Sequence, residues 1–167
     1  LSRVLKAGAT TYKIKEWYET GAIRNENFIA ATELLPETKD RASNSNMLSV
    51  DSLEDLLEAG FIKEDLSLIR IFSNKKVYPY KIRTWYKTSL IRNPNFAILA
   101  HGLQDYDIDY SYLDTHIEAG FLEEDMPLIH KLLKNSNEIW NITAGYKDGT
   151  IRNPNFAPIY DALSALS

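Results

Sequence analysis

The hexapeptide IRNPNF occupies residues 91–96 and again residues 151–156, and residues 23–28 read IRNENF. Extension towards the N-terminus gives three longer segments that align without gaps: YKIKEWYETGAIRNENF (12–28), YKIRTWYKTSLIRNPNF (80–96) and WNITAGYKDGTIRNPNF (140–156). A second pair of similar segments lies between them, namely LLEAGFIKEDLSLI (56–69) and HIEAGFLEEDMPLI (116–129). The chain therefore repeats two related patterns.

Both patterns share an apolar or aromatic residue, a turn residue three positions later and an aliphatic residue shortly after it. The turn residues are Gly21, Gly60, Ser89, Gly120 and Gly149. They recur with a period of roughly 30 residues, which is typical of stacked supersecondary units, none of which can bury its apolar face alone. We therefore predict five repeated units.

The hexapeptide itself has the features of a turn that starts a helix. Gly21 or its equivalent ends one helix in a left-handed conformation, and Ile91 follows as an apolar residue. Asn93 suits the N-cap of the next helix and Pro94 its first position. Phe96 then begins an apolar stripe, and the last unit repeats this pattern. Each unit is therefore predicted to be a helical hairpin.

The predicted fold is all-α: one domain, residues 1–167, built as an α-solenoid of about five αα-hairpins. Ankyrin and tetratricopeptide arrays have this architecture, but the residues match neither consensus. The polar stretch PETKDRASNSNM (36–47) is predicted to be a surface loop between the first two hairpins. Because the chain begins without Met, we expect it to be a fragment of a longer one.

Charge and composition narrow the class of partner. The 167 residues carry a net charge of −4, which disfavours a broad phosphate-binding surface and hence nucleic acid. No apolar run is long enough to span a bilayer. The absence of cysteine excludes disulfides and thiol catalysis, and it suits a cytoplasmic location, or the host cytosol for a secreted effector.

Three arginines recur at one position of the hexapeptide turn: Arg24, Arg92 and Arg152. Stacked turns would align them as a row that binds carboxylates or phosphates. The alternative, which the recurrence favours, is structural: each arginine bonds the end of a neighbouring helix or covers an apolar residue. Trp17 and Trp85 also share a position, which is Gly145 in the last unit, and we expect them to pack against the following hairpin.

The segment DYDIDYSYLDTH (105–116) has the most unusual composition. Its alternating aspartates imitate the start of a calcium-binding EF-hand loop, but position six is Tyr110 instead of Gly and position twelve is His116 instead of Glu. No metal site is therefore predicted. Interleaved acids and tyrosines suit a protein-contact surface, with solvated and partly packed tyrosines as the alternative. The partner-binding residues predicted here are Tyr106, Asp107, Asp109, Tyr110 and Tyr112.

No catalytic motif is present. His101, His116 and His130 form no recognised ligand pair, and no nucleophile elbow or phosphate-binding glycine loop occurs. We therefore predict a non-enzymatic protein- or peptide-recognition module without a cofactor, and the acidic charge favours a basic partner. A peptide along the first helices would meet residues such as Lys13, Glu16, Arg83 and Thr84.

Three other functions stay open from sequence alone. The first is an accessory helical domain of a larger enzyme or secreted bacterial effector whose catalytic part lies elsewhere. The second is a helical-repeat nucleic-acid reader that uses the three arginines. The third is a small hydrolase that uses His101 or His116, although no sequence motif supports this function.

Overall fold

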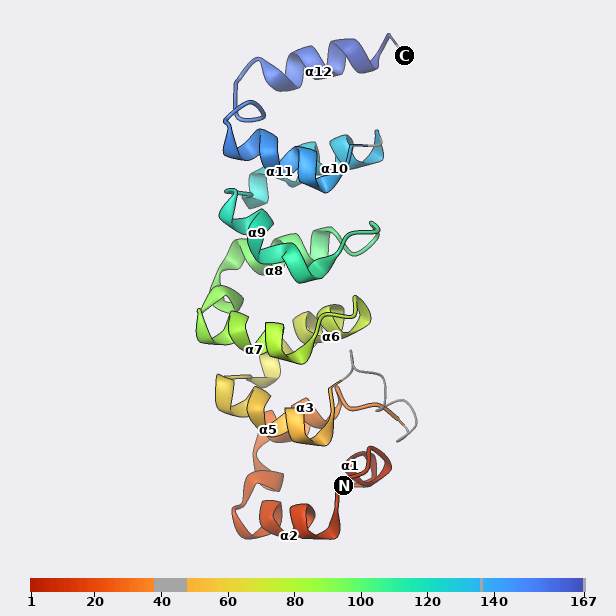
Figure 1. The fold of residues 1–167 in the computed structure, drawn as a ribbon, viewed down its shortest axis with the longest axis vertical. Helices are drawn as coiled ribbons and strands as arrows, with labels where there is room; N and C mark the ends of the chain where they lie inside the picture. The colour runs from red at the N-terminus through yellow and green to blue at the C-terminus, as the bar shows by residue number, and fades with distance from the viewer. Residues whose placement is uncertain (38–47, 136, 167) are drawn as a thin grey trace. The chain divides into compact units, whose positions relative to one another are not determined.

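The computed structural model describes residues 1–37, 48–135 and 137–166, and every regular element in these residues is helical (Figure 1). The all-α prediction is confirmed. The predicted polar loop 36–47 lies outside the described residues except for Pro36 and Glu37. The chain forms two compact units, Leu1–Asn93 and Pro94–Ser167.

The first unit contains six α-helices in its described residues, with short 3-10 helices between them. They are α1 (Ser2–Lys6), α2 (Thr11–Glu19), η1 (Ala22–Arg24), α3 (Glu26–Thr32), α5 (Val50–Ala59), η2 (Lys63–Asp65), α6 (Leu66–Asn74), α7 (Pro79–Lys87) and η3 (Leu90–Arg92). Helix α5 packs against both α3 and α7. Trp17 and Phe28 meet edge to face in this core, with ring centroids 4.9 Å apart.

The second unit repeats much of this order. Its elements are α8 (Pro94–Gly102), η4 (Tyr110–Tyr112), α9 (Leu113–Glu118), η5 (Glu123–Asp125), α10 (Met126–Lys134), α11 (Ile139–Lys147) and α12 (Phe156–Ser164). Helix α8 packs against α9, and α10 against α11. The bounds of η5, α10 and α11 follow those of η2, α6 and α7 at one constant offset along the chain, so the sequence repeat is also a repeat of secondary structure.

All five predicted turn residues adopt the left-handed backbone conformation. Their φ angles are 75° at Gly21, 117° at Gly60, 61° at Ser89, 100° at Gly120 and 81° at Gly149. Each follows the helix that the sequence predicts it to end. Ser89 is the informative case, because a side chain in this region costs roughly 1–2 kcal/mol, and the turn is kept nonetheless.

The caps of the hexapeptide turns follow the prediction in the first copy and depart from it in the last. Asn25 caps α3 by accepting the Asn27 N–H at 2.8 Å. In the last copy Asn153 likewise accepts the Asn155 N–H at 2.9 Å, but α12 begins only at Phe156, not at Pro154. The chain from residue 150 to 155 forms turns instead of a first helical turn.

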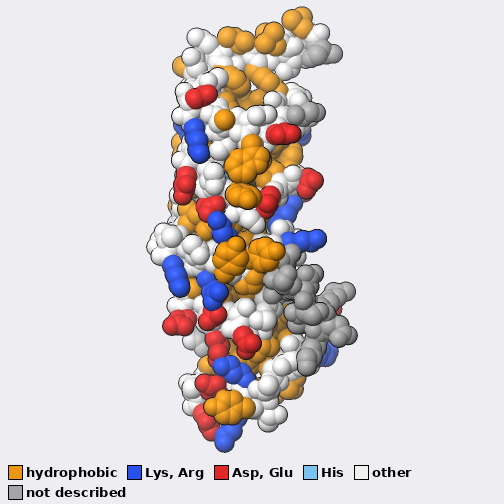
Figure 2. Space-filling view, viewed as in Figure 1, with side chains coloured by type: hydrophobic (Ala, Val, Ile, Leu, Met, Phe, Trp, Pro, Cys, Tyr) orange, Lys and Arg blue, Asp and Glu red, His pale blue; other side chains and the backbone are white. Residues whose placement is uncertain are grey.

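The apolar stripes that begin at Phe96 and at Phe156 differ in burial. Leu99 of α8 and Leu103, which directly follows α8, are fully buried, as predicted. Their counterparts on α12, Ile159 and Leu163, are 58% and 62% exposed, so the prediction of a buried stripe is wrong for α12. Hydrophobic side chains accordingly gather over α12 in the space-filling view (Figure 2).

Candidate functional site

The most tightly connected polar cluster of the first unit joins the turn after α5 to the turn after α7. Arg92 donates from Nη1 to Asp65 Oδ1 at 2.6 Å and from Nη2 to Asp65 Oδ2 at 3.0 Å, which makes a bidentate pair. Its Nη2 also donates to the Gly60 carbonyl at 3.0 Å. The Tyr86 hydroxyl donates to Asp65 Oδ2 at 2.8 Å. We call these four residues the Asp65 cluster.

The carboxylate of this cluster is buried and fully hydrogen-bonded. The Asp65 side chain is only 9% exposed, and it also accepts the N–H of Ile62, which closes the turn. The hydrogen bond to Asp65 raises the pKa of Arg92. Burial, followed by the hydrogen bond to Asp65, raises the pKa of Tyr86. The arginine is therefore charged and the tyrosine neutral throughout the usual pH range, and both stabilise the carboxylate.

The second unit builds a similar arrangement in the next copy of the repeat, but with a single bond from Arg152 to the carboxylate and no hydrogen bond from the Tyr146 hydroxyl to any described residue. Arg152 donates to the Gly120 carbonyl and to Asp125 Oδ2, the latter at 3.2 Å. Its guanidinium lies over the ring of Tyr146, 5.2 Å from the centroid, as Arg92 lies 5.6 Å from that of Tyr86. The Asp125 side chain is 16% exposed, so this Asp125 cluster is somewhat more open.

Two of the three arginines that the sequence suggests as an anion-binding row are engaged within their own units. Arg92 and Arg152 are held by a carboxylate and a glycine carbonyl of their own units, which is the structural alternative that their recurrence favours. Arg24 differs from both. Its side chain is exposed and makes no hydrogen bond or ion pair with any residue that the structure describes.

The two tryptophans that share a repeat position are core residues. Trp17 is 2% exposed and donates its indole N–H to Glu54 of α5, in the following hairpin, at 2.7 Å. Trp85 is 1% exposed and meets Phe72 of the preceding hairpin, with centroids 5.0 Å apart. The replacement of this tryptophan by Gly145 in the last unit has a steric reason, because a Cβ at position 145 would lie 2.7 Å from the side chain of Ile151.

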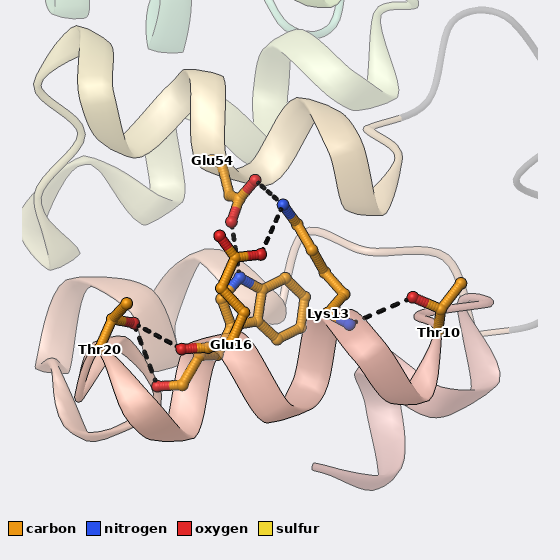
Figure 3. Close-up of polar contacts among 6 residues, drawn as sticks. Thr10, Lys13, Glu16, Thr20 and Glu54 are labelled. Carbon is orange, nitrogen blue, oxygen red and sulfur yellow. Dashed lines mark hydrogen bonds and ion pairs between the residues drawn. The ribbon is translucent and has the colours of Figure 1, made fainter.

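Residues expected to face a peptide along the first helices are engaged within the first unit. Lys13 and Glu16 of α2 converge with Glu54 of α5 (Figure 3). The hydrogen bond to Glu54 raises the pKa of Lys13; burial opposes the ionisation of Glu54, but bonds from Lys13 and Trp17 lower its pKa overall. Arg83 pairs with Asp55 at 2.5 Å. These contacts join neighbouring hairpins.

The acidic and tyrosine-rich segment divides into a buried and an open part. Tyr110 is fully buried and donates its hydroxyl to the Ala100 carbonyl at 2.6 Å, so the prediction of an exposed contact ring is wrong for Tyr110. Burial, together with the charge of Asp105, raises its pKa. Tyr112 is 47% exposed, and Asp107 and Asp109 are exposed. The alternation of Asp and Tyr did not reveal which ring points inwards.

The open part lines a groove of about 420 Å³ that the sequence did not predict as a whole. Its polar and aromatic walls come from the 106–109 segment and from the start of α11; we call it the acidic groove, defined by Tyr106, Asp107, Asp109, Glu138 and Trp140. Trp140 is 46% exposed and meets Tyr112 edge to face, with centroids 5.3 Å apart. The sequence signal for Trp140 as a contact residue was its position in the repeat, where it aligns with two other aromatic residues, Tyr12 and Tyr80.

Two of the three histidines are held by hydrogen bonds inside the second unit. His116 is fully buried beside Trp140 and Phe121, and its Nδ1 lies 2.8 Å from Thr143 Oγ1. Because the Thr143 hydroxyl donates to the Ile139 carbonyl, His116 Nδ1 must carry the proton. Burial lowers the pKa of His116 to about 4. His130 Nε2 lies 2.8 Å from the Gly102 carbonyl, which can only accept, so this nitrogen is the donor.

No protein-family model, curated protein or solved structure matches this chain. Within the described residues, no group of three or more His, Cys, Asp or Glu side chains could hold a metal ion. None of the helices in that part of the chain has the length and apolar character needed to cross a membrane.

Proposed function

We propose that the chain is a non-enzymatic recognition module of stacked helical hairpins, which binds a peptide or protein segment with basic residues. The observation that carries the proposal is the acidic groove, where three exposed carboxylates stand beside a half-exposed tryptophan. Its carboxylates are those of Asp107, Asp109 and Glu138.

This chemistry favours lysine and above all arginine. A guanidinium forms bidentate bonds with carboxylates and stacks on an indole face, and such cation–π contacts contribute about 0.5–2 kcal/mol. Trp140 and Tyr112 expose rigid rings, which give contact area at low conformational-entropy cost. The net charge of −4 adds a field that attracts basic segments.

An array of short peptides tests this function. Peptides that contain arginine or lysine are expected to bind, and the same peptides with glutamine at those positions are not. Binding should weaken by roughly tenfold or more in Trp140→Ala and in the double variant Asp107→Asn/Asp109→Asn, since each tenfold corresponds to about 1.4 kcal/mol.

A matched control uses acids of the same chain that do not line the groove. The double variant Glu118→Gln/Asp161→Asn removes two exposed carboxylates from the same unit and should leave peptide binding unchanged. Equal loss in the control and the groove variants would show that only net charge matters. Binding that does not depend on the basic residues of the peptide would refute the proposal.

A further inference from the structure

Two aromatic side chains that line the acidic groove, Tyr106 and Trp140, each lie against a histidine ring. Trp140 meets His116 edge to face, with ring centroids 5.1 Å apart. Tyr106 lies against His130, with ring centroids 5.6 Å apart. Both histidines belong to the second unit, as the groove does, so each aromatic ring of the groove has an aromatic support of its own.

The support of Trp140 is fixed by a chain of hydrogen bonds. His116 Nδ1 lies 2.8 Å from Thr143 Oγ1, and the Thr143 hydroxyl donates to the Ile139 carbonyl at 2.8 Å. Trp140 also meets the ring of Tyr112 edge to face, with centroids 5.3 Å apart. An indole that is 46% exposed and yet contacts two other rings is preorganised, so a ligand that stacks on it orders little that was mobile before.

Tyr106 is held in a similar way. Its hydroxyl donates to the carbonyl of His130 at 3.4 Å, and the ring of the same histidine packs on its own ring. His130 Nε2 in turn donates to the Gly102 carbonyl at 2.8 Å. The groove is therefore lined by two aromatic side chains whose positions are set from within the unit.

The other lining residues divide into an exposed acidic part and an apolar part. The three carboxylates of the groove are exposed, whereas Ile139 is buried and Ile108 and Leu133 are half-buried. Aliphatic side chains and ring faces offer no strong acceptor, so an ammonium or guanidinium group that reaches them loses hydrogen bonds to water. A trimethylammonium group has no N–H donor to leave unsatisfied, and it keeps the positive charge that a ring face attracts.

We propose that the acidic groove binds trimethyllysine within a partner polypeptide. The inference rests on the proposed function and narrows its ligand: the quaternary ammonium contacts the rings of Tyr106 and Trp140 and the apolar lining, and the carboxylates attract its charge. An unmodified basic side chain pairs with the carboxylates and leaves the apolar lining uncovered. A groove of about 420 Å³ is of the size that holds a whole ligand and not a head group alone, which favours a polypeptide over a free quaternary amine.

The test uses the unaltered chain and the fluorescein-labelled peptide Gly-Ala-Arg-Ala-Lys-Ala-Arg-Ala-Gly in three forms. The lysine is unmodified, trimethylated, or replaced by the uncharged isostere in which carbon takes the place of the quaternary nitrogen. In fluorescence anisotropy the trimethylated form should bind about fivefold more tightly than the unmodified form, and the isostere no more tightly than the unmodified form.

Variants of Trp140 separate the aromatic ring from its apolar area. Trp140→Leu should abolish the preference for the trimethylated peptide, and Trp140→Phe should keep part of it. Because the preference compares two peptides on the same variant, it does not depend on what fraction of that variant is folded. Tyr12→Leu removes a 78% exposed ring at the same repeat position of the other unit and should leave the preference unchanged.

The outcomes distinguish this inference from the function on which it rests. Equal binding of the trimethylated and unmodified peptides overturns the inference alone, whereas absence of binding by both overturns the proposed function as well. An isostere that binds as tightly as the trimethylated peptide overturns the inference, because the charge is then not recognised. Choline that displaces the labelled peptide as effectively as the unlabelled trimethylated peptide does overturns the assignment to a polypeptide.

Discussion

The Asp65 cluster makes a quantitative prediction about how one hairpin is joined to the next. The perturbation is a double-mutant cycle on Asp65→Asn and Arg92→Gln, in which each change removes a charge and keeps a polar side chain of similar size. If the cluster stabilises the contact between the two turns, the single changes should be costly and their sum should exceed the cost of the double change.

The magnitude follows from the contacts. Asp65 accepts four hydrogen bonds, two from Arg92, one from the Tyr86 hydroxyl and one from the Ile62 N–H. Hydrogen bonds to charged groups contribute roughly 1.5–3 kcal/mol, and loss of one partner leaves the other charge buried. Because Arg92 is 45% exposed, solvent screens part of this energy. We expect about 2 kcal/mol for each single change and a coupling of about 1–2 kcal/mol.

Urea unfolding followed by circular dichroism measures these free energies, provided that the dependence on urea concentration is the same in all variants. The control cycle is Arg83→Gln and Asp55→Asn, an ion pair of the same unit whose side chains are 36% and 49% exposed. Exposed pairs couple by about 0.2–1 kcal/mol. A coupling for Asp65 and Arg92 that is no larger than the control would refute the role assigned to the cluster.

Three further predictions concern single positions. Unfolded His116 binds a proton below about pH 6.5 but the folded residue only below about pH 4, so stability should fall by about 3 kcal/mol as pH falls through this window. His116→Asn keeps the bond to the threonine hydroxyl and should remove this slope in urea unfolding at several pH values, whereas His101→Asn, at an exposed site, should retain it. Gly145→Ala should destabilise the fold by about 1–3 kcal/mol through its clash with Ile151, and a neutral result in thermal unfolding would show that Ile151 can move aside. Phe96→Ala should cost about 3–5 kcal/mol in urea unfolding because Phe96 is fully buried; a loss below about 1 kcal/mol would contradict that burial.

The sequence predicted local conformation well because the turn signals are local. A residue such as Gly60 ends its helix through its own backbone freedom, and the five turns lie where the repeat placed them. Side-chain surroundings depend on neighbours that the repeat does not name. Tyr110 and Tyr112 are close together in one segment, yet one is fully buried and the other 47% exposed, because only the first reaches a carbonyl of α8.

The clusters also explain why the chain alternates two kinds of hairpin and repeats the hexapeptide. The Gly60 carbonyl and the buried Asp65 carboxylate lie in the turn after α5, and Arg92 of the next hexapeptide donates to both. Ile91 and Ile151 of the hexapeptide are buried beside these arginines, at 5% and 7% exposure. In these two hexapeptides the arginine therefore binds the turn of the preceding hairpin, and in the first hexapeptide Asn25 caps the helix that follows. One short segment thus joins two hairpins, which is a physical reason for its recurrence.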